Sequence, residues 1–350
     1  MPNTKTDTQS IQAGVERTQV GLVHGGGGRL AQDLVDFVFG ERLDSLWLPG
    51  QYDGAVIEFE GVRLAVATDS FVVNPLFFPG GNIGTLAVNG TINDLAMCGA
   101  RPKFLCAGFI LEEGLDMEAL DRITTSMRES AESQDVRFLT GDTKVVDRGK
   151  GDGLYINTTG LGVIEHDTVI EAKSVRPGDV VLINGDIGRH GIAIMSSRVG
   201  LGYERSISSD CAPLVHPVLD LLDEGLEVHC LRDLTRGGLA GRLSEVAQAA
   251  QARIEIREID VPIRSEVREA CDFLGLDPYH VSNEGRFVAF VAPGDAARAL
   301  EVLREAGADG VAARIGEVGE EADALVVVRP TVGSPKILDT LSGEHLPRGS

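Results

Sequence analysis

The feature that most constrains the fold is the alternation of short apolar runs with longer amphipathic stretches along most of the chain. Short apolar or β-branched runs are typical of buried strands, and apolar residues three or four apart are typical of helices. Their alternation predicts a mixed α and β protein. In the first half we expect strands at 55–59, 63–68, 103–110, 137–140 and 155–164, and helices at 30–39, 82–97 and 116–133.

A second set of elements begins after the turn sequence Arg176-Pro177-Gly178-Asp179. Here we expect strands at 180–184, 253–257, 287–291 and 324–328, and helices at 191–197, 213–224, 238–249, 262–274 and 295–306. Because 350 residues exceed the usual size of one hydrophobic core, we place a domain boundary near 165–174. The predicted parts are a flexible N-terminus, an N-terminal domain, a C-terminal domain and a flexible tail, at 1–19, 20–167, 168–330 and 331–350.

The charge balance and composition exclude several classes of partner. The chain has 53 Asp and Glu against 32 Lys and Arg, and this net charge of −21 disfavours nucleic-acid binding. No apolar stretch approaches the ~20 residues that span a bilayer, and the first residues lack the apolar core of a signal peptide. We therefore expect a cytoplasmic protein without membrane contact. The five cysteines form no CxxC pair, which predicts reduced, mostly buried thiols rather than a zinc site or disulfides.

The first candidate site is the glycine-rich segment His24-Gly25-Gly26-Gly27-Gly28. Consecutive glycines let the backbone approach an anion and point N–H groups at it. The segment is not a Walker A loop, because no Gly-Lys-Ser/Thr follows. A loose GxGxxA match leaves nicotinamide binding open, although the next acidic residues lie farther along than a dinucleotide fold requires. A plain surface loop is the other interpretation.

Three aspartates follow apolar runs and precede a small or hydroxyl residue, which predicts that they lie at strand ends. They are Asp69 in Thr68-Asp69-Ser70, Asp142 in Gly141-Asp142-Thr143 and Asp233 in Asp233-Leu234-Thr235. Aspartates at strand ends can point into a cleft and hold Mg²⁺ against a triphosphate. One such aspartate alone is more often a helix N-cap. Three together favour a metal–nucleotide site.

Polar side chains also interrupt the apolar run LAVNGTINDLAMCG of the helix expected at 82–97. Asn89 and Asn93 are four residues apart and share one face, with Asp94 adjacent. Such groups are costly to bury without partners, so they predict a metal–nucleotide site or a hydrogen-bonded contact with a neighbouring loop or subunit. Lys144 and Glu284 are of the types that transfer protons at the mouth of a site; the alternative is that each is a surface charge.

Four long stretches resemble the HypE family of carbamoyl dehydratases, which serve the maturation of nickel–iron hydrogenases. They are TDSFVVNPLFFPGGNIGTLAVNGTINDLAMCGARP, FILEEGL, TGDTKVVDRGKGDGLYINTTGLG and LRDLTRGGL. The resemblance runs from about residue 23 to residue 317.

This resemblance implies a two-domain PurM-like fold of the aminoimidazole ribonucleotide synthetase superfamily. Its N-terminal α/β domain would form a barrel across a homodimer, and its C-terminal domain would be α+β. The implied activity is the dehydration, with ATP and Mg²⁺, of a carbamoyl group on a C-terminal cysteine to a thiocyanate, the source of the hydrogenase's cyanide ligand. The implied partners are HypF, which donates the carbamoyl group, and the HypC–HypD complex, which takes the cyanide to iron.

Residues that match the family's motifs take their expected roles from the resemblance. The implied nucleotide-binding residues are His24, Gly25, Gly26, Gly27, Gly28, Asp69, Asn89, Asn93, Asp94, Asp142, Thr143, Asp233 and Asn283. The implied metal ligands are Asp53, Asp69, Asp94, Asp142 and Asp233. Lys144 and Glu284 are the implied proton-handling pair beside the tail, and the glycine-rich segment is the implied flap over the phosphates.

The chain departs from the family at two places. Tyr52 replaces the second acid that the family often has beside Asp53, which weakens metal binding from that loop. The family ends in Pro-Arg-Ile-Cys, whereas this chain ends in Pro347-Arg348-Gly349-Ser350, so Ser350 occupies the catalytic position of the modified cysteine. Serine is the weaker nucleophile, and its carbamate would yield a cyanate ester.

Several explanations stay open at this point. The tail can be engineered, inactive, or that of a paralogue with another substrate. The chain can also be a small-molecule ATP-dependent kinase of the same superfamily, or a non-catalytic scaffold for the maturation proteins.

Overall fold

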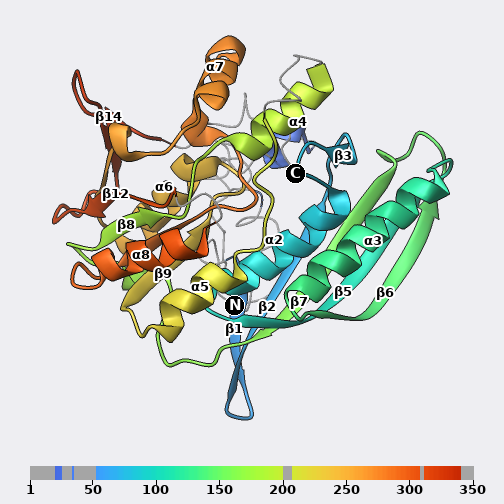
Figure 1. The fold of residues 1–350 in the computed structure, drawn as a ribbon, viewed down its shortest axis with the longest axis horizontal. Coiled ribbons are helices and arrows are strands. Elements are labelled where there is room, and N and C mark those ends of the chain that lie inside the picture. Colours follow the sequence, from blue (N-terminus) through green and yellow to red (C-terminus); the bar gives the residue numbers. More distant parts are fainter. Residues whose placement is uncertain (1–19, 26–33, 35–52, 200–206, 308–310, 340–350) are drawn as a thin grey trace, which may run out of the picture.

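The first part of the chain forms an open five-stranded sheet with two helices on one face (Figure 1). The computed structural model describes residues 20–25, 34, 53–199, 207–307 and 311–339. The strand order is β1-β2-β7-β5-β6, and the β5–β6 pair is parallel while its other pairs are antiparallel. The elements are η2 (Leu22–Gly25), β1 (Ala55–Phe59), β2 (Val62–Phe71), β3 (Phe77–Phe78), β4 (Gly81–Asn82), α2 (Ile83–Met97), β5 (Arg101–Glu112), α3 (Met117–Ser133), β6 (Arg137–Val146) and β7 (Leu154–Val163).

Helix α2 is the central element of the molecule, because it lies between this sheet and the second part of the chain (Figure 1). Every residue of α2 except Thr85 is buried. Its start is fixed by a capping box, in which the side chain of Asn82 accepts two helix N–H groups and Thr85 Oγ1 accepts the Asn82 N–H. Gly160 of β7 permits the close approach, since a Cβ there would lie 2.8 Å from carbons of Leu95 and Thr91. The buried side chains of Asn89, Asn93 and Asp94 in α2 therefore lie where the first sheet and the second part of the chain meet.

The second part is a seven-stranded sheet in the order β14-β13-β10-β12-β8-β11-β9. Helices α5 and α8 pack on one face, and their apolar side chains join those of α2 and the first sheet in one core, while α6 contributes to a separate core on the other face. The elements are η4 (Ala172–Ser174), β8 (Val180–Ile183), α4 (Arg189–Val199), α5 (Val215–Asp223), β9 (Val228–Asp233), α6 (Gly238–Ala250), β10 (Ile254–Arg257), η6 (Glu258–Asp260), α7 (Ser265–Leu274), η7 (Pro278–His280), β11 (Phe287–Val291), α8 (Ala296–Ala306), β12 (Ala313–Val318), β13 (Val326–Arg329) and β14 (Lys336–Ile337).

Most of the predicted elements are confirmed, with two corrections that bear on the site. Asp69 and Asp142 do not end their strands: β2 continues to Phe71 and β6 to Val146. Hydroxyl and charged residues are tolerated there because Asp69 lies at the solvent-reaching end of β2 and β6 is an exposed edge strand. Asp233 does end its strand, β9. The helix expected at 30–39 lies outside the described residues except for Leu34.

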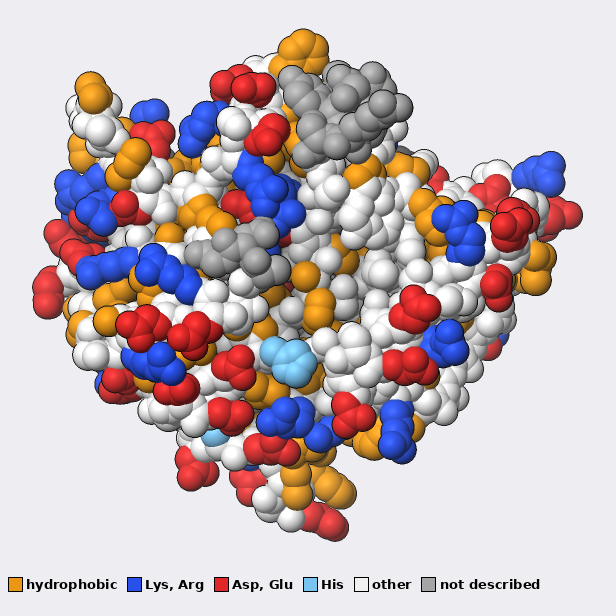
Figure 2. Space-filling view, in the orientation of Figure 1, with side chains coloured by type: hydrophobic (Ala, Val, Ile, Leu, Met, Phe, Trp, Pro, Cys, Tyr) orange, Lys and Arg blue, Asp and Glu red, His pale blue; other side chains and the backbone are white. Residues whose placement is uncertain are grey.

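The described residues show neither a closed barrel nor a bilayer-spanning helix. The first sheet is open, with β1 and β6 at its edges, and none of the described helices is both long and apolar enough to cross a membrane. All five cysteines are free, and three of them are buried. Acidic and basic side chains are interspersed over the face drawn in Figure 2, so the excess negative charge is spread over that face.

Candidate active site

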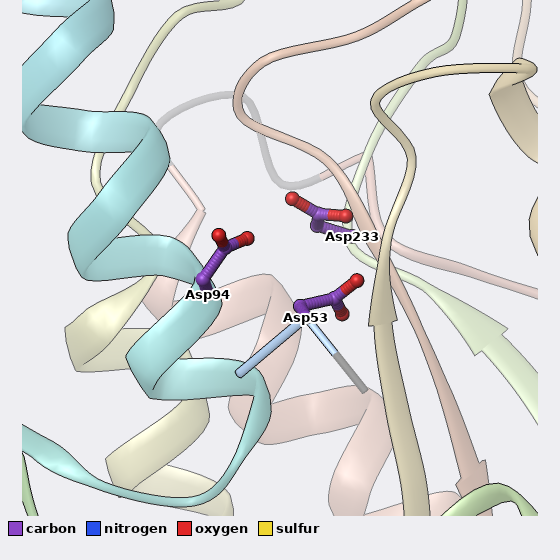
Figure 3. Close-up of side chains that lie close together, drawn as sticks. All are labelled: Asp53, Asp94 and Asp233. Carbon is purple, nitrogen blue, oxygen red and sulfur yellow. The ribbon is translucent and has the colours of Figure 1, made fainter. Parts of the chain in front are cut away.

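Three carboxylates from distant parts of the sequence converge where the two parts of the fold meet (Figure 3). Asp53 precedes β1, Asp94 belongs to the last turn of α2, and Asp233 is the last residue of β9. One oxygen from each lies within 4.8 Å of the others. A different element positions each side chain: the packed helix α2 positions Asp94, the end of β9 positions Asp233, and the segment that leads into β1 positions Asp53.

Two arginines, the buried Arg232 and the largely buried Arg242, partly neutralise this cluster, which we call the aspartate cluster (Asp53, Asp94 and Asp233). Arg232 Nη1 lies 3.2 Å from Asp53 Oδ1, and Arg242 Nη2 lies 3.7 Å from Asp233 Oδ1. Both guanidinium groups also pair with Glu245. The sequence reasoning missed Arg232, Arg242 and Glu245. The available signal was the arginine directly before Asp233, since a cation beside a buried acid is the usual way to keep it charged.

The aspartate cluster retains excess negative charge. Burial, followed by the charges of Asp69, Asp233 and Asp53, raises the pKa of Asp94 well above its ordinary value. Burial and the charge of Asp53 raise the pKa of Asp233 to about 7, although the two arginines oppose this. Asp53 Oδ2 is buried without a hydrogen-bond partner among the described residues. A set of oxygen ligands with an unsatisfied carboxylate fits a hard divalent cation such as Mg²⁺.

Asp69 adjoins the cluster, whereas Asp142 does not. The charge of Asp69 makes the largest contribution of any neighbouring charge to the raised pKa of Asp94. Asp142 and Lys144 lie on the exposed strand β6, where Lys144 Nζ is 2.5 Å from Asp142 Oδ2. The Asp142–Lys144 hydrogen bond lowers the pKa of Asp142. Within one chain the structure thus groups four of the five predicted metal ligands and leaves the segment from Asp142 to Lys144, including Thr143, elsewhere.

Glu284 is buried in the loop between η7 and β11, beside the aspartate cluster. Burial raises its pKa well above the ordinary value, as do the charges of Asp233, Asp210 and Asp69, in that order, while Arg236 opposes them. Its neighbour Asn283 has no exposed surface. The Asn283 amide accepts the Gly188 N–H at 2.7 Å and donates to the carbonyls of Leu234 and Val281, so it fixes the loop that carries Glu284.

The two asparagines of α2 face the second part of the chain. Asn93 donates to the carbonyls of Ala212 and Glu284 and accepts the Leu214 N–H at 2.7 Å. Asn89 donates to Cys211 Sγ, and its carbonyl oxygen is buried without a partner among the described residues. The hydrogen-bonded contact that the sequence left open is therefore present for Asn93, and Asn89 keeps one unsatisfied acceptor beside the site.

Of the predicted glycine-rich flap, His24 and Gly25 are among the described residues. His24 and Gly25 close η2, where His24 Nδ1 accepts the Gly21 N–H at 2.9 Å. The predicted flap residues Gly26, Gly27 and Gly28 lie outside the described residues, as does Ser350.

This fold and this site define a class of protein. Residues 51–164 match the family model described as AIR synthase related protein, N-terminal domain, and residues 176–329 match the corresponding C-terminal domain. The PurM-like, two-domain fold with mixed α/β content is thereby confirmed.

Relatives of known name narrow the class. The carbamoyl dehydratase HypE of Azotobacter vinelandii is 46% identical over 329 residues, which cover 94% of this chain and 96% of that protein. A crystal structure of hydrogenase maturation protein HypE in complex with ATP has a TM-score of 0.80 and 45% identity, and covers 95% of this chain and 100% of that one. A HypE–HypF complex has a TM-score of 0.82 and 41% identity, and covers 88% and 99%. The chain belongs to the HypE family of carbamoyl dehydratases.

Proposed function

We propose that this chain is an ATP- and Mg²⁺-dependent carbamoyl dehydratase of nickel–iron hydrogenase maturation. The observation that carries the proposal is the buried aspartate cluster beside Glu284, in a chain that matches HypE proteins over nearly its full length. The reaction converts R–S–C(O)NH₂ and ATP into R–S–C≡N, ADP and phosphate. Phosphorylation of the amide oxygen creates a leaving group, and the nitrogen gives up its protons as the C–O bond breaks.

Each group of residues has a part in this reaction. Asp53, Asp69, Asp94 and Asp233 would hold Mg²⁺, which would offset charge at the phosphates of ATP. Glu284 would accept a proton from the carbamoyl nitrogen. Arg232 and Arg242 offset part of the repulsion among the acids. ATP binding is supported by the relative solved with ATP, and HypF as carbamoyl donor by the relative solved with HypF. We extend the proposal to cyanide delivery through HypC–HypD.

The first prediction concerns the tail. A variant with Gly349→Ile and Ser350→Cys, carbamoylated at the new thiol and given ATP and Mg²⁺, is expected to lose the mass of one water from its tail. Intact-mass spectrometry measures this, with the unaltered Ser350 chain as the control. A carbamoyl mass that persists after nucleotide turnover would falsify the dehydratase assignment. ATP turnover independent of the tail would favour the small-molecule kinase, and absence of nucleotide binding would favour the scaffold.

We also propose that the exposed face of the first sheet joins two copies of the chain into a homodimer with a shared barrel. Strand β6 is an edge strand exposed over nearly its whole length, and its Leu139 and Val145 side chains are 61% and 68% exposed. Such apolar edges are ordinarily covered by another chain. A second copy on β6 would bring Asp142, Thr143 and Lys144 to a site that they do not reach in their own chain.

The second prediction tests this arrangement. Leu139→Asp is expected to shift the protein from dimer to monomer in sedimentation equilibrium, because a charge would be buried in the interface. Met117→Asp, at an exposed position that begins α3, serves as the matched control. Mixing Lys144→Ala and Glu284→Gln chains is expected to restore about a quarter of the activity if Lys144 serves the partner's site, since half of the dimers regain one intact site. Absence of any recovery would place Lys144 in its own chain's site.

A further inference from the structure

The backbone of Glu284 is held from both sides by buried side chains of other segments. Its N–H donates to Asp210 Oδ2 at 3.3 Å, and its carbonyl accepts from Asn93 Nδ2 at 3.3 Å. Asn93 belongs to α2 and Asp210 to the segment before α5. These two hydrogen bonds fix the backbone of Glu284 relative to α2. They therefore also fix the point from which its side chain extends relative to Asp94, which follows Asn93 in that helix.

The segment 209–212 that carries Asp210 is itself clamped. Ser209 N–H donates to the Pro79 carbonyl at 2.7 Å, and the Ala212 carbonyl accepts from Asn93 at 3.0 Å. On its other side the segment packs directly on Gly285, where a Cβ would come within 2.0 Å of the Asp210 carbonyl oxygen. The segment therefore contacts both the first domain and Gly285, and so it fixes the residue after Glu284 relative to the first domain.

Asp210 is a buried carboxylate with few compensating partners, which is unfavourable for a residue that only stabilises the fold. Its side chain has no exposed surface, and its ion pair among the described residues is a long one, with Arg286 Nε 3.9 Å from Oδ2. Its Oδ1 is buried with no hydrogen-bond partner among the described residues. A buried carboxylate with so little compensation costs stability. Among the described residues, its side chain is joined to the site through the hydrogen bond from the Glu284 N–H.

We propose that Asp210 is a positioning residue for the dehydration, fixing the backbone of Glu284 so that its carboxylate meets the reacting group. This inference rests on the proposed function. The hydrogen bond predicts that Asp210 acts through Glu284 alone, and that the acceptor oxygen matters more than the charge. Displacement of a reacting group by about 1 Å can lower a rate roughly 10²-fold.

The test uses the full chain with Gly349→Ile and Ser350→Cys, and measures kcat for dehydration, KM for ATP and the melting temperature. Asp210→Ala is expected to lower kcat roughly 10²-fold with KM for ATP nearly unchanged. Asp210→Asn keeps an oxygen that can accept the Glu284 N–H, and is expected to recover most of kcat. Asp220→Ala, at an exposed position on α5, is the matched control.

A double mutant separates positioning from general damage. In a Glu284→Gln background, Asp210→Ala is expected to cause little further loss, because its effect passes through Glu284. A full additional loss there, or a normal kcat for Asp210→Ala alone, would overturn the inference. Should Asp210→Ala fail to fold, Asp210→Ser is measured instead, since its shorter side chain cannot reach the Glu284 N–H. If the parent chain itself does not dehydrate its tail, the proposed function fails rather than this inference.

Discussion

In the chain that carries Gly349→Ile and Ser350→Cys, Glu284→Gln is expected to lower the rate of tail dehydration roughly 10²- to 10⁴-fold, the usual contribution of a general acid or base. The glutamine side chain has the same shape, so the backbone hydrogen bonds to Asp210 and Asn93 remain. ATP binding is expected to change little, because the predicted metal ligands and the nucleotide-binding residues of the aspartate cluster are untouched.

The electrostatics of Glu284 explain why the effect should fall on the rate rather than on binding. Burial and the charges of Asp233, Asp210 and Asp69 raise its pKa, which favours the protonated form of Glu284 as long as those charges are uncompensated. When the charges of Asp233 and Asp69 are offset, as they would be with a cation bound, two of these causes weaken. The pKa of Glu284 would then fall, so the carboxylate would accept a proton more readily in the loaded site, where a proton must be removed.

Single-turnover mass spectrometry of the carbamoylated tail measures this rate, and calorimetry measures ATP affinity. Glu269→Gln, at an exposed position on α7, is the control and is expected to leave both unchanged. Dehydration by Glu284→Gln at the rate of the Gly349→Ile, Ser350→Cys parent would remove Glu284 from the mechanism. A matching loss of ATP affinity would instead assign it to nucleotide binding.

The sequence was most informative where local signals and tertiary packing agree. The predicted bounds of helix α2 differ from the observed ones by one residue, because Asn82 is a strong N-cap and the apolar run that follows it is too long for a strand. The polar residues of α2 indicated a buried polar site, because amides and carboxylates in an apolar run need hydrogen-bond or metal partners. The family resemblance then supplied the activity, which no periodicity contains.

The sequence was least informative where pairing between distant segments decides the structure. β2 and β6 run past Asp69 and Asp142 because β7 and β5 lie beside them, and strand extension depends on that pairing. The partial neutralisation of the aspartate cluster by Arg232 and Arg242 also depends on the tertiary structure, because it brings together segments that are distant in the sequence. The separation of Lys144 from Glu284 could not be predicted either, because the proposed pairing requires a second chain.

The last prediction concerns the stability of the metal-free protein as a function of pH. The pKa of Asp233 is about 7 in the folded protein, against about 3.9 for an unfolded aspartate. Between these values the folded state holds a proton that the unfolded state has released, so the free energy of unfolding falls as pH rises through this window. Below the window the contribution is fully present, and above about pH 8 it is lost.

Asp233→Asn is therefore expected to stabilise the metal-free protein at about pH 8.5 and to matter little near pH 4, with a difference on the order of a few kcal/mol. Asp94→Asn should act in the same direction, since burial and neighbouring acids also raise the pKa of Asp94. Urea unfolding at several pH values measures the effect, with the exposed Asp220→Asn as control. Added Mg²⁺ should stabilise the unaltered chain at high pH and stabilise Asp233→Asn much less, because the variant lacks a ligand. If Asp233→Asn is destabilising at every pH, the pairing of Asp233 with Arg242 outweighs repulsion within the aspartate cluster, and the cluster is held by its arginines rather than completed by a cation.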